Sequence, residues 1–268
     1  MCVPGCHEAV HRALSRRGFF RNAAVLATAA GAASLAPLSQ VFAQEMKFSK
    51  AVDLTHTTWP EFPTFFNKPQ LEIEDVTTLE KDGFNTKRWH LVEHTGTHMD
   101  APFHFTKDKE SADRIPVESL VAPLAVINIT DRAASDPDAQ LTADDIKAWE
   151  TKNGALPARC CVAMNSGWDQ HVKTPKFRND MHFPGFHPDA VALLLERDAL
   201  GIAVDTLSLD YGQSKDFATH YAWLPTNRWG LEAVANLDPL PATGATIVVG
   251  APTIVGATGG PSRVIALI

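Results

Sequence analysis

The segment at residues 94–105, His-Thr-Gly-Thr-His-Met-Asp-Ala-Pro-Phe-His-Phe, places three histidines and one aspartate within eleven positions. Its glycine and proline disfavour a helix. In an extended chain, side chains of equal parity point to one side of the backbone. Two imidazoles and a carboxylate that converge in this way are typical ligands of a catalytic zinc or manganese ion that keeps a position open for water. The side chains that share this parity are His94, His98, Asp100 and His104. The alternative, a chance scatter of surface histidines, does not explain the density, the parity and the glycine–proline frame together.

This segment resembles the pattern His-x-Gly-Thr-His-x-Asp-x-Pro-x-His-Phe of the metal-dependent cyclase-family hydrolases, which include bacterial kynurenine formamidases and isatin hydrolases. Every fixed position of the pattern is filled. The resemblance implies that His94, His98 and Asp100 bind the metal, whereas His104 transfers protons and is not a ligand. It also implies an α/β fold, namely a compact β/α/β domain of the swivelling type with a mixed sheet, assembled as a homodimer or higher homo-oligomer.

A second pair of candidate residues lies far along the chain. In the family, a histidine and a glutamate twelve residues apart complete the metal site, and His220 and Glu232 have this spacing. By this resemblance Asp100 and Glu232 bridge a second ion that His220 also binds, as in kynurenine formamidases, which makes Glu232 both a ligand and a candidate catalytic residue. Other members work with one manganese ion. Nitrogen and oxygen ligands do not separate zinc from manganese, so we expect one or two ions of either kind.

The chemistry expected of these residues is hydrolysis of a C–N bond. A divalent ion lowers the pKa of bound water toward neutrality, and a neutral His104 can accept a proton and deliver it to the leaving nitrogen. No Gly-x-Ser-x-Gly sequence indicates a competing serine nucleophile. We therefore predict an amidohydrolase whose substrate is a small amide or lactam: an aryl formamide, an isatin-like compound or another cyclic amide. The rival hypothesis is a non-catalytic periplasmic metal-binding protein, which would not need an acid–base histidine beside its ligands.

The elements that position these residues follow a strand–helix–strand pattern, which favours parallel pairing. Thr142, followed by acidic residues, predicts a helix N-terminus, and that helix is expected to end near Gly154. A second helix is expected to begin at His187 and to end before Gly201. Apolar or alternating runs predict strands at residues 51–56, 70–77, 86–93, 123–129, 159–164, 202–207, 245–250 and 264–268. The strand at 86–93 is expected to run directly into the ligand segment.

Two tryptophans are candidates for the wall of a substrate pocket. Trp59 lies in a loop rich in aromatic residues and prolines, and its position resembles that of a pocket tryptophan in kynurenine formamidases. The alternative is that this loop covers the core or a subunit interface. Trp168 follows a predicted strand, at the end where open α/β sheets place ligand-binding groups. It could instead cover the edge of the sheet.

The first 43 residues resemble an export signal. Ser-Arg-Arg-Gly-Phe-Phe-Arg at residues 15–21 precedes an Ala-rich apolar run to Leu38 and a small-residue cleavage site that ends at Ala43. This predicts that the twin-arginine translocase exports the folded protein to the periplasm, and that residues 44–268 form one metallohydrolase domain. The apolar run is short for a membrane span, which disfavours a membrane anchor. The alternative is that the leader is kept as an uncleaved anchor.

The charge of the remaining chain restricts its partners. Removing residues 1–43, which hold four arginines and one glutamate, leaves 20 basic and 30 acidic residues and a formal net charge of −10. An acidic chain of this kind is not expected to bind nucleic acid or anionic lipid. No stretch of residues 44–268 approaches the roughly 20 apolar residues of a membrane span. The expected partner is a small-molecule substrate.

Overall fold

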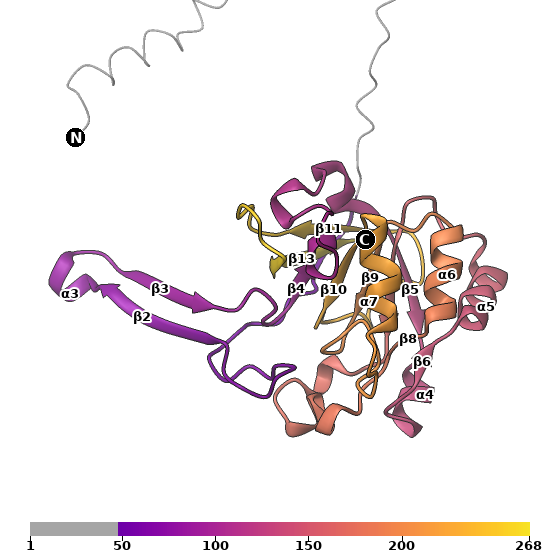
Figure 1. Cartoon of the computed structure of the whole chain (residues 1–268), viewed down its shortest axis with the longest axis horizontal. Helices are drawn as coiled ribbons and strands as arrows, with labels where there is room; N and C mark the ends of the chain where they lie inside the picture. Colours follow the sequence, from indigo (N-terminus) through magenta and orange to yellow (C-terminus); the bar gives the residue numbers. More distant parts are fainter. Residues whose placement is uncertain (1–47) are drawn as a thin grey trace, which may run out of the picture. The chain divides into compact units, whose positions relative to one another are not determined.

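The computed structural model describes residues 48–268, and in this part of the chain the main element is a mixed sheet of nine strands (Figure 1). The export signal predicted for residues 1–43 lies outside the described residues. In spatial order the strands are β1 (Ala51–Asp53), β13 (Arg263–Leu267), β11 (Ala245–Gly250), β5 (Val121–Asn128), β7 (Cys161–Asn165), β9 (Gly201–Val204), β10 (Trp229–Glu232), β4 (His98–Asp100) and β12 (Gly259–Pro261). Two short strands, β6 (Gln140–Leu141) and β8 (Gly185–Phe186), pair separately. The predicted mixed α/β fold is confirmed.

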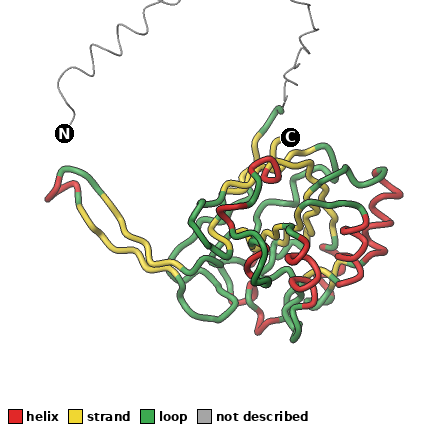
Figure 2. Tube along the Cα trace, turned by 45° about the horizontal axis from the view of Figure 1, so that its top comes forward, coloured by secondary structure: helices red, strands yellow, loops and turns green. Residues whose placement is uncertain are grey.

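The centre of the sheet is parallel, from β5 through β7 and β9 to β10. Helix α5 (Ala143–Asn153) connects β5 to β7, and α6 (Pro188–Glu196) connects β7 to β9, so both expected crossovers are present. Thr142 caps α5 in a reciprocal capping box with Asp145. Figure 2 shows α5 and α6 together at one side of the sheet. The other α-helices of residues 48–268 are α3 (Leu79–Asp82), α4 (Thr130–Ser135) and α7 (Ala218–Trp223).

Alternate residues of the central strands contribute to two cores, one on each face of the sheet. Along β7, Val162 and Met164 pack with residues of α5 and α6, whereas Cys161 and Ala163 pack on the opposite side with β1, β11 and β13. Strands buried on both faces have continuous apolar sequences rather than alternating ones. Burial on both faces thus anchors the parallel centre, from which the loops and strands at its edge extend.

Strands β2 (Leu71–Thr77) and β3 (Thr86–Leu91) form a separate antiparallel hairpin, here named the arm, that extends away from the sheet (Figure 1). Opposite residues Ile73 and Trp89 are 46% and 69% exposed, so the arm presents apolar side chains to solvent. The prediction that the strand at 86–93 runs into the ligand segment is wrong, because β3 ends at Leu91 and a bend separates it from β4.

The ligand segment is also less extended than its parity suggested. Gly96 has a φ of +72°, and a Cβ atom at this position would lie 2.2 Å from Thr58 Oγ1, so only glycine fits. After the three-residue strand β4, Pro102–His104 form a 3₁₀ turn. The shared direction of the candidate ligands therefore comes from a bend, a short strand and a turn.

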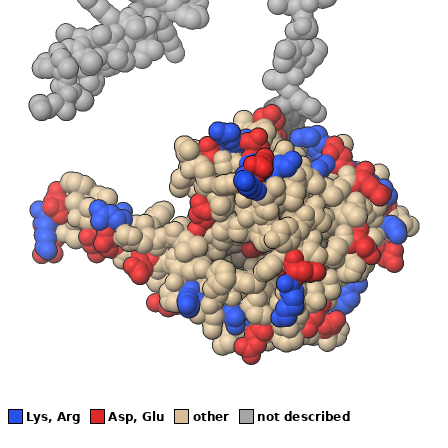
Figure 3. Space-filling model, in the orientation of Figure 1, with Lys and Arg blue, Asp and Glu red and all other residues tan. Residues whose placement is uncertain are grey.

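On the face shown in Figure 3, Lys and Arg side chains are interspersed with Asp and Glu, and most of the middle of the face is uncharged. This face therefore offers no continuous basic surface to a phosphate backbone. Within residues 48–268, no helix has both the length and the apolar character needed to cross a bilayer.

Candidate metal centre and active site

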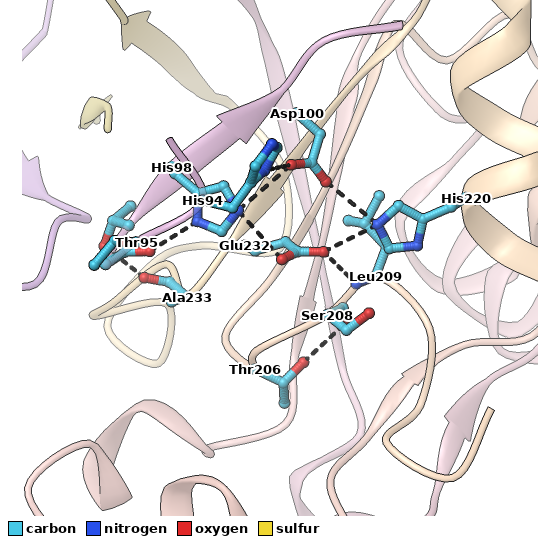
Figure 4. A network of polar contacts seen from close by, with 12 residues as sticks. His94, Thr95, His98, Asp100, Thr206, Ser208, Leu209, His220, Glu232 and Ala233 are labelled. Carbon is cyan, nitrogen blue, oxygen red and sulfur yellow. Dashed lines mark hydrogen bonds and ion pairs between the residues drawn. The ribbon is translucent and has the colours of Figure 1, made fainter. Parts of the chain in front are cut away.

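The pairing of β4 with β10 brings three of the predicted residues onto one face. These strands are antiparallel, and His98 is opposite Glu232 in the ladder. Asp100 lies two residues beyond His98 and therefore points to the same side. Figure 4 shows the three side chains converging from the two strands. All three are buried, with 6% exposure or less.

His220 reaches the same point from helix α7. Its Nε2 atom lies 3.4 Å from Asp100 Oδ2 and 3.2 Å from Glu232 Oε1. On the other side, His98 Nε2 lies 3.4 Å from Asp100 Oδ1 and 3.3 Å from Glu232 Oε2. The four groups thus form a ring in which each carboxylate lies between the two imidazoles.

The spacing of these donors fits an ion better than it fits direct hydrogen bonds. Charge-assisted N–H···O contacts are about 2.7–2.9 Å long, shorter than the four distances of 3.2–3.4 Å. Nitrogen and oxygen ligands at about 2.0–2.1 Å from a tetrahedral zinc ion lie about 3.3 Å from one another. In addition, His98 Nε2 and Asp100 Oδ2 are buried and have no hydrogen-bond partner. Such orphaned atoms are costly unless something else binds them, so the donor set fits a divalent ion.

The far nitrogen of each imidazole is held by a hydrogen bond. His98 Nδ1 donates to the carbonyl oxygen of Gly96 at 2.9 Å, and His220 Nδ1 donates to Asp210 Oδ2 at 2.5 Å. The Nε2 lone pairs are therefore directed into the ring. Sequence reasoning missed Asp210, which also accepts the backbone N–H of Thr219 at 2.8 Å. Its one available sign was a carboxylate shortly after a predicted strand.

The buried acids and imidazoles of this cluster shift one another's pKa. Burial lowers the pKa of His98, but the adjacent carboxylates of Asp100 and Glu232 outweigh it and raise the pKa to about 10 without a metal. The pKa of His220 is raised well above its usual value, because the adjacent carboxylates of Asp100, Asp210 and Glu232 likewise outweigh burial. Burial raises the pKa of Asp100, but the three surrounding histidines hold it well below its usual value. In the metal-free protein, His98 and His220 therefore bind protons where a metal ion would otherwise bind.

His94 and His104 form the second group of donors. His94 Nδ1 lies 2.7 Å from Asp100 Oδ1, and the His104 ring stacks on the His94 ring with centroids 3.9 Å apart. Two groups of three residues each bring one donor atom per residue within 4.8 Å of the others. The first group is His94, Asp100 and His104, and the second is His98, Asp100 and Glu232. Burial lowers the pKa of His104 to about 4, so its imidazole is neutral at ordinary pH.

A cavity of about 190 Å³ opens onto these groups. His98, His104, His220 and Glu232 form its polar end. Its remaining wall is mostly apolar and contains Phe65, Phe66, Phe105 and Phe217. A small concave site with apolar walls and a few converging polar groups is typical of an enzyme active site.

The two predicted pocket tryptophans do not line this cavity. Trp168 is 2% exposed, and its indole nitrogen donates to the carbonyl oxygen of Phe177 at 2.9 Å, so it belongs to the core. Trp59 packs on Phe62 and lines a separate open cleft, whose wall shares Pro63 with the cavity. Both tryptophans therefore pack against other side chains, and phenylalanines contribute the aromatic part of the cavity wall in their place.

Comparisons with known proteins show which family the chain is similar to. A family model described as "Putative cyclase" matches residues 52–211. An isatin hydrolase of Roseibium aggregatum is 36% identical over 217 residues, which cover 75% of this chain and 82% of that protein. A kynurenine formamidase of Salinibacter ruber is 27% identical over 162 residues, 60% of this chain and 70% of that protein. A crystal structure of an isatin hydrolase bound to the product analogue thioisatinate has a TM-score of 0.77 and 35% identity, over 82% of this chain and 92% of that chain.

Proposed function

This chain belongs to the cyclase family, and from that premise we propose that it is a metal-dependent hydrolase that cleaves a C–N bond of a small amide or lactam. The observation that carries the proposal is the ring of two imidazoles and two carboxylates, which is spaced for an ion and opens onto a small, mostly apolar cavity. Named relatives that act as an isatin hydrolase and a kynurenine formamidase support the same bond type.

The residues that would hold the metal are His98, Asp100, His220 and Glu232, with His94 beside Asp100. A zinc or manganese ion bound there supplies Lewis acidity and lowers the pKa of water in the site. The donor set contains no thiolate, so both metals suit it. Asp100 contacts both groups of donors, which supports either one ion or two.

We propose His104 as the group that moves the proton. Its ring is neutral at ordinary pH, so it can accept a proton as water attacks the carbonyl carbon. It can then deliver this proton to the departing nitrogen, which is a poor leaving group until it is protonated. The stack on His94 holds the ring at the polar end of the cavity.

The cavity supports a flat, small substrate. Ligand sites for drug-sized molecules measure about 300–1,000 Å³, whereas this cavity has about 190 Å³. Phenylalanine side chains on its wall suit an aromatic ring. An aryl amide or an isatin-like lactam meets both conditions.

Two further proposals concern where the protein works and how it assembles. The twin arginines at positions 16 and 17 support export to the periplasm by the twin-arginine translocase. The exposed apolar side chains of the arm support a homodimer or higher homo-oligomer, because a two-stranded hairpin is marginally stable alone in water.

Metal analysis followed by a hydrolysis panel tests the proposed function. Purified protein should contain one or two equivalents of zinc or manganese. It should open isatin or hydrolyse an aryl formamide, and a chelator should abolish turnover until the metal is restored. A fully metal-loaded protein without activity on isatin, an aryl formamide or a saturated lactam would favour the non-catalytic metal-binding alternative.

A further inference from the structure

The wall of the cavity contains a serine hydroxyl that the proposed function has not used. Two hydroxyl side chains line the cavity, those of Thr64 and Ser208. The Thr64 hydroxyl donates to the carbonyl oxygen of Lys68 at 2.8 Å, so its proton is occupied. Ser208 is only 3% exposed, and the hydrogen bonds found within residues 48–268 use its carbonyl oxygen but not its hydroxyl. Its proton is therefore available to a molecule in the cavity.

The backbone holds Ser208 next to the ring of metal-binding donors. The N–H of the following residue, Leu209, donates to Glu232 Oε1 at 2.9 Å, and the carbonyl oxygen of Leu209 accepts the N–H of Phe186 at 2.8 Å. On the other side, the Thr206 hydroxyl lies 3.2 Å from the carbonyl oxygen of Ser208. Figure 4 shows Ser208 and Leu209 beside Glu232. The chain is thus fixed before and after Ser208, at the polar end of the cavity.

Ser208 is a hydrogen-bond donor among groups that only accept. The Glu232 carboxylate has no proton to donate, and the Nε2 lone pairs of His98 and His220 are directed into the ring. With an ion in the ring, none of these three groups offers a proton to an oxygen atom of a substrate. A fixed donor aimed at an oxygen that gains negative charge stabilises a transition state strongly in a site from which water is largely excluded.

The proposed hydrolysis generates an oxygen of this kind. As water adds to the carbonyl carbon, its proton passes to His104 and an electron pair of the C=O bond moves onto the carbonyl oxygen. When the C=O bond forms again, the C–N bond breaks and His104 returns the proton to the nitrogen. The negative charge on the oxygen is largest between these two steps. A donor to this oxygen therefore accelerates the reaction instead of only tightening substrate binding.

We propose that Ser208 is a catalytic residue that donates a hydrogen bond to the carbonyl oxygen of the substrate as negative charge develops on it. The inference rests on the proposed C–N bond hydrolysis and adds a residue that lies outside the ligand segment. Ser208 acts on the oxygen of the scissile bond, whereas His104 acts on its nitrogen. The two residues should therefore differ in how their loss depends on the leaving group.

Ser208→Ala, which removes the hydroxyl, tests the proposal. Its kcat should fall about 10²–10³-fold, the usual effect of losing a side-chain donor to a developing oxyanion. KM and metal content should stay close to the wild type, because the metal-binding groups are intact. The loss should be equal on an aryl amide and on an activated ester of the same acid, since both develop the same negative oxygen. His104→Ala should instead spare the ester.

A matched control and a second variant keep the test decisive. Ser119→Ala removes the hydroxyl of another buried serine, which donates to the Pro116 carbonyl oxygen at 2.7 Å outside the cavity, and should leave kcat unchanged. If Ser208→Ala does not fold, Ser208→Cys replaces it, because a thiol is a weak donor.

Three results would overturn the proposal: an unchanged kcat, a change confined to KM, or loss of metal from the Ser208 variants. A loss on the amide alone would also overturn it, because the hydroxyl would then act on the nitrogen. A wild type that hydrolyses neither the amide nor the ester refutes the proposed function together with this inference. An active wild type with an equally active Ser208→Ala variant refutes only this inference.

Discussion

Replacing His104 by Asn tests whether the site performs acid–base chemistry. Burial lowers the pKa of His104 to about 4, so only about one ring in a thousand is protonated at pH 7 and nearly every molecule can accept a proton. Loss of such a group costs about 10²–10⁴ in kcat, or about 3–5 kcal/mol of transition-state stabilisation at 1.36 kcal/mol per tenfold change. Asparagine keeps part of the volume and polarity but does not titrate, so His104→Asn should lose nearly as much as His104→Ala.

The assay combines kcat with metal content on two kinds of substrate. Both variants should keep their metal, because the ring of His98, Asp100, His220 and Glu232 is complete without His104. An activated ester, whose leaving group needs little protonation, should be hurt less than a plain amide. In the wild type, kcat/KM should fall as the pH drops through about 4, because the protonated ring can no longer accept a proton. The variants should lack this acidic limb.

Three results would contradict this reasoning in different ways. Loss of metal together with activity would make His104 a ligand, in line with its proximity to His94 and Asp100. Equal losses on the ester and the amide would indicate that His104 orients water or substrate. Undiminished amide hydrolysis in both variants would refute the assignment of His104 altogether.

Four further changes have defined outcomes. His98→Ala should lose most of the bound zinc or manganese in elemental analysis, and full occupancy would remove His98 from the ligand set. Metal-free protein should be most stable to urea below about pH 6.5 and should lose stability as the pH rises toward 10. The reason is that the folded state raises the pKa of His98 to about 10 and so keeps a proton that the unfolded state releases. A stability that does not change with pH over this range would contradict this. Joint replacement of Arg16 and Arg17 by Lys should retain the protein in the cytoplasm, which fractionation would detect, and normal export would exclude a twin-arginine signal. Trp89→Lys on the arm should lower the mass measured by light scattering from that of an oligomer to that of one chain, whereas an unchanged oligomer would exclude the arm as its interface.

The sequence predicted the parallel centre of the fold because local rules were sufficient there. Thr142 caps a helix with its own neighbours, and apolar runs of strand length become buried strands whatever lies beside them. The arm was predicted as two strands, but its separation from the sheet was not, since the alternation of Ile73 and Trp89 with polar residues does not say which surface they face.

In the candidate site, too, the sequence predicted the features that depend on local spacing and missed those that depend on tertiary structure. His98 and Asp100 are on one strand, so their common direction follows from spacing alone. The position of Asp210 beside His220 depends on tertiary structure, and Asp210 belongs to no local pattern. Trp168 misled the prediction because a tryptophan at a strand end is equally suited to a pocket wall and to a core, and its hydrogen bond to Phe177 decided for the core.

The arm has a consequence for how the protein behaves on dilution. Its two strands begin directly after Gln70 and end directly before Val92, which are joined by a backbone hydrogen bond of 3.0 Å and both line the cavity. A two-stranded hairpin with so little buried surface is marginally stable in water by itself. If a second subunit covers the arm, it dissociates by mass action as the protein concentration falls, and the cavity wall then loosens. The specific activity would then decline at nanomolar concentrations and recover on concentration, with the metal still bound.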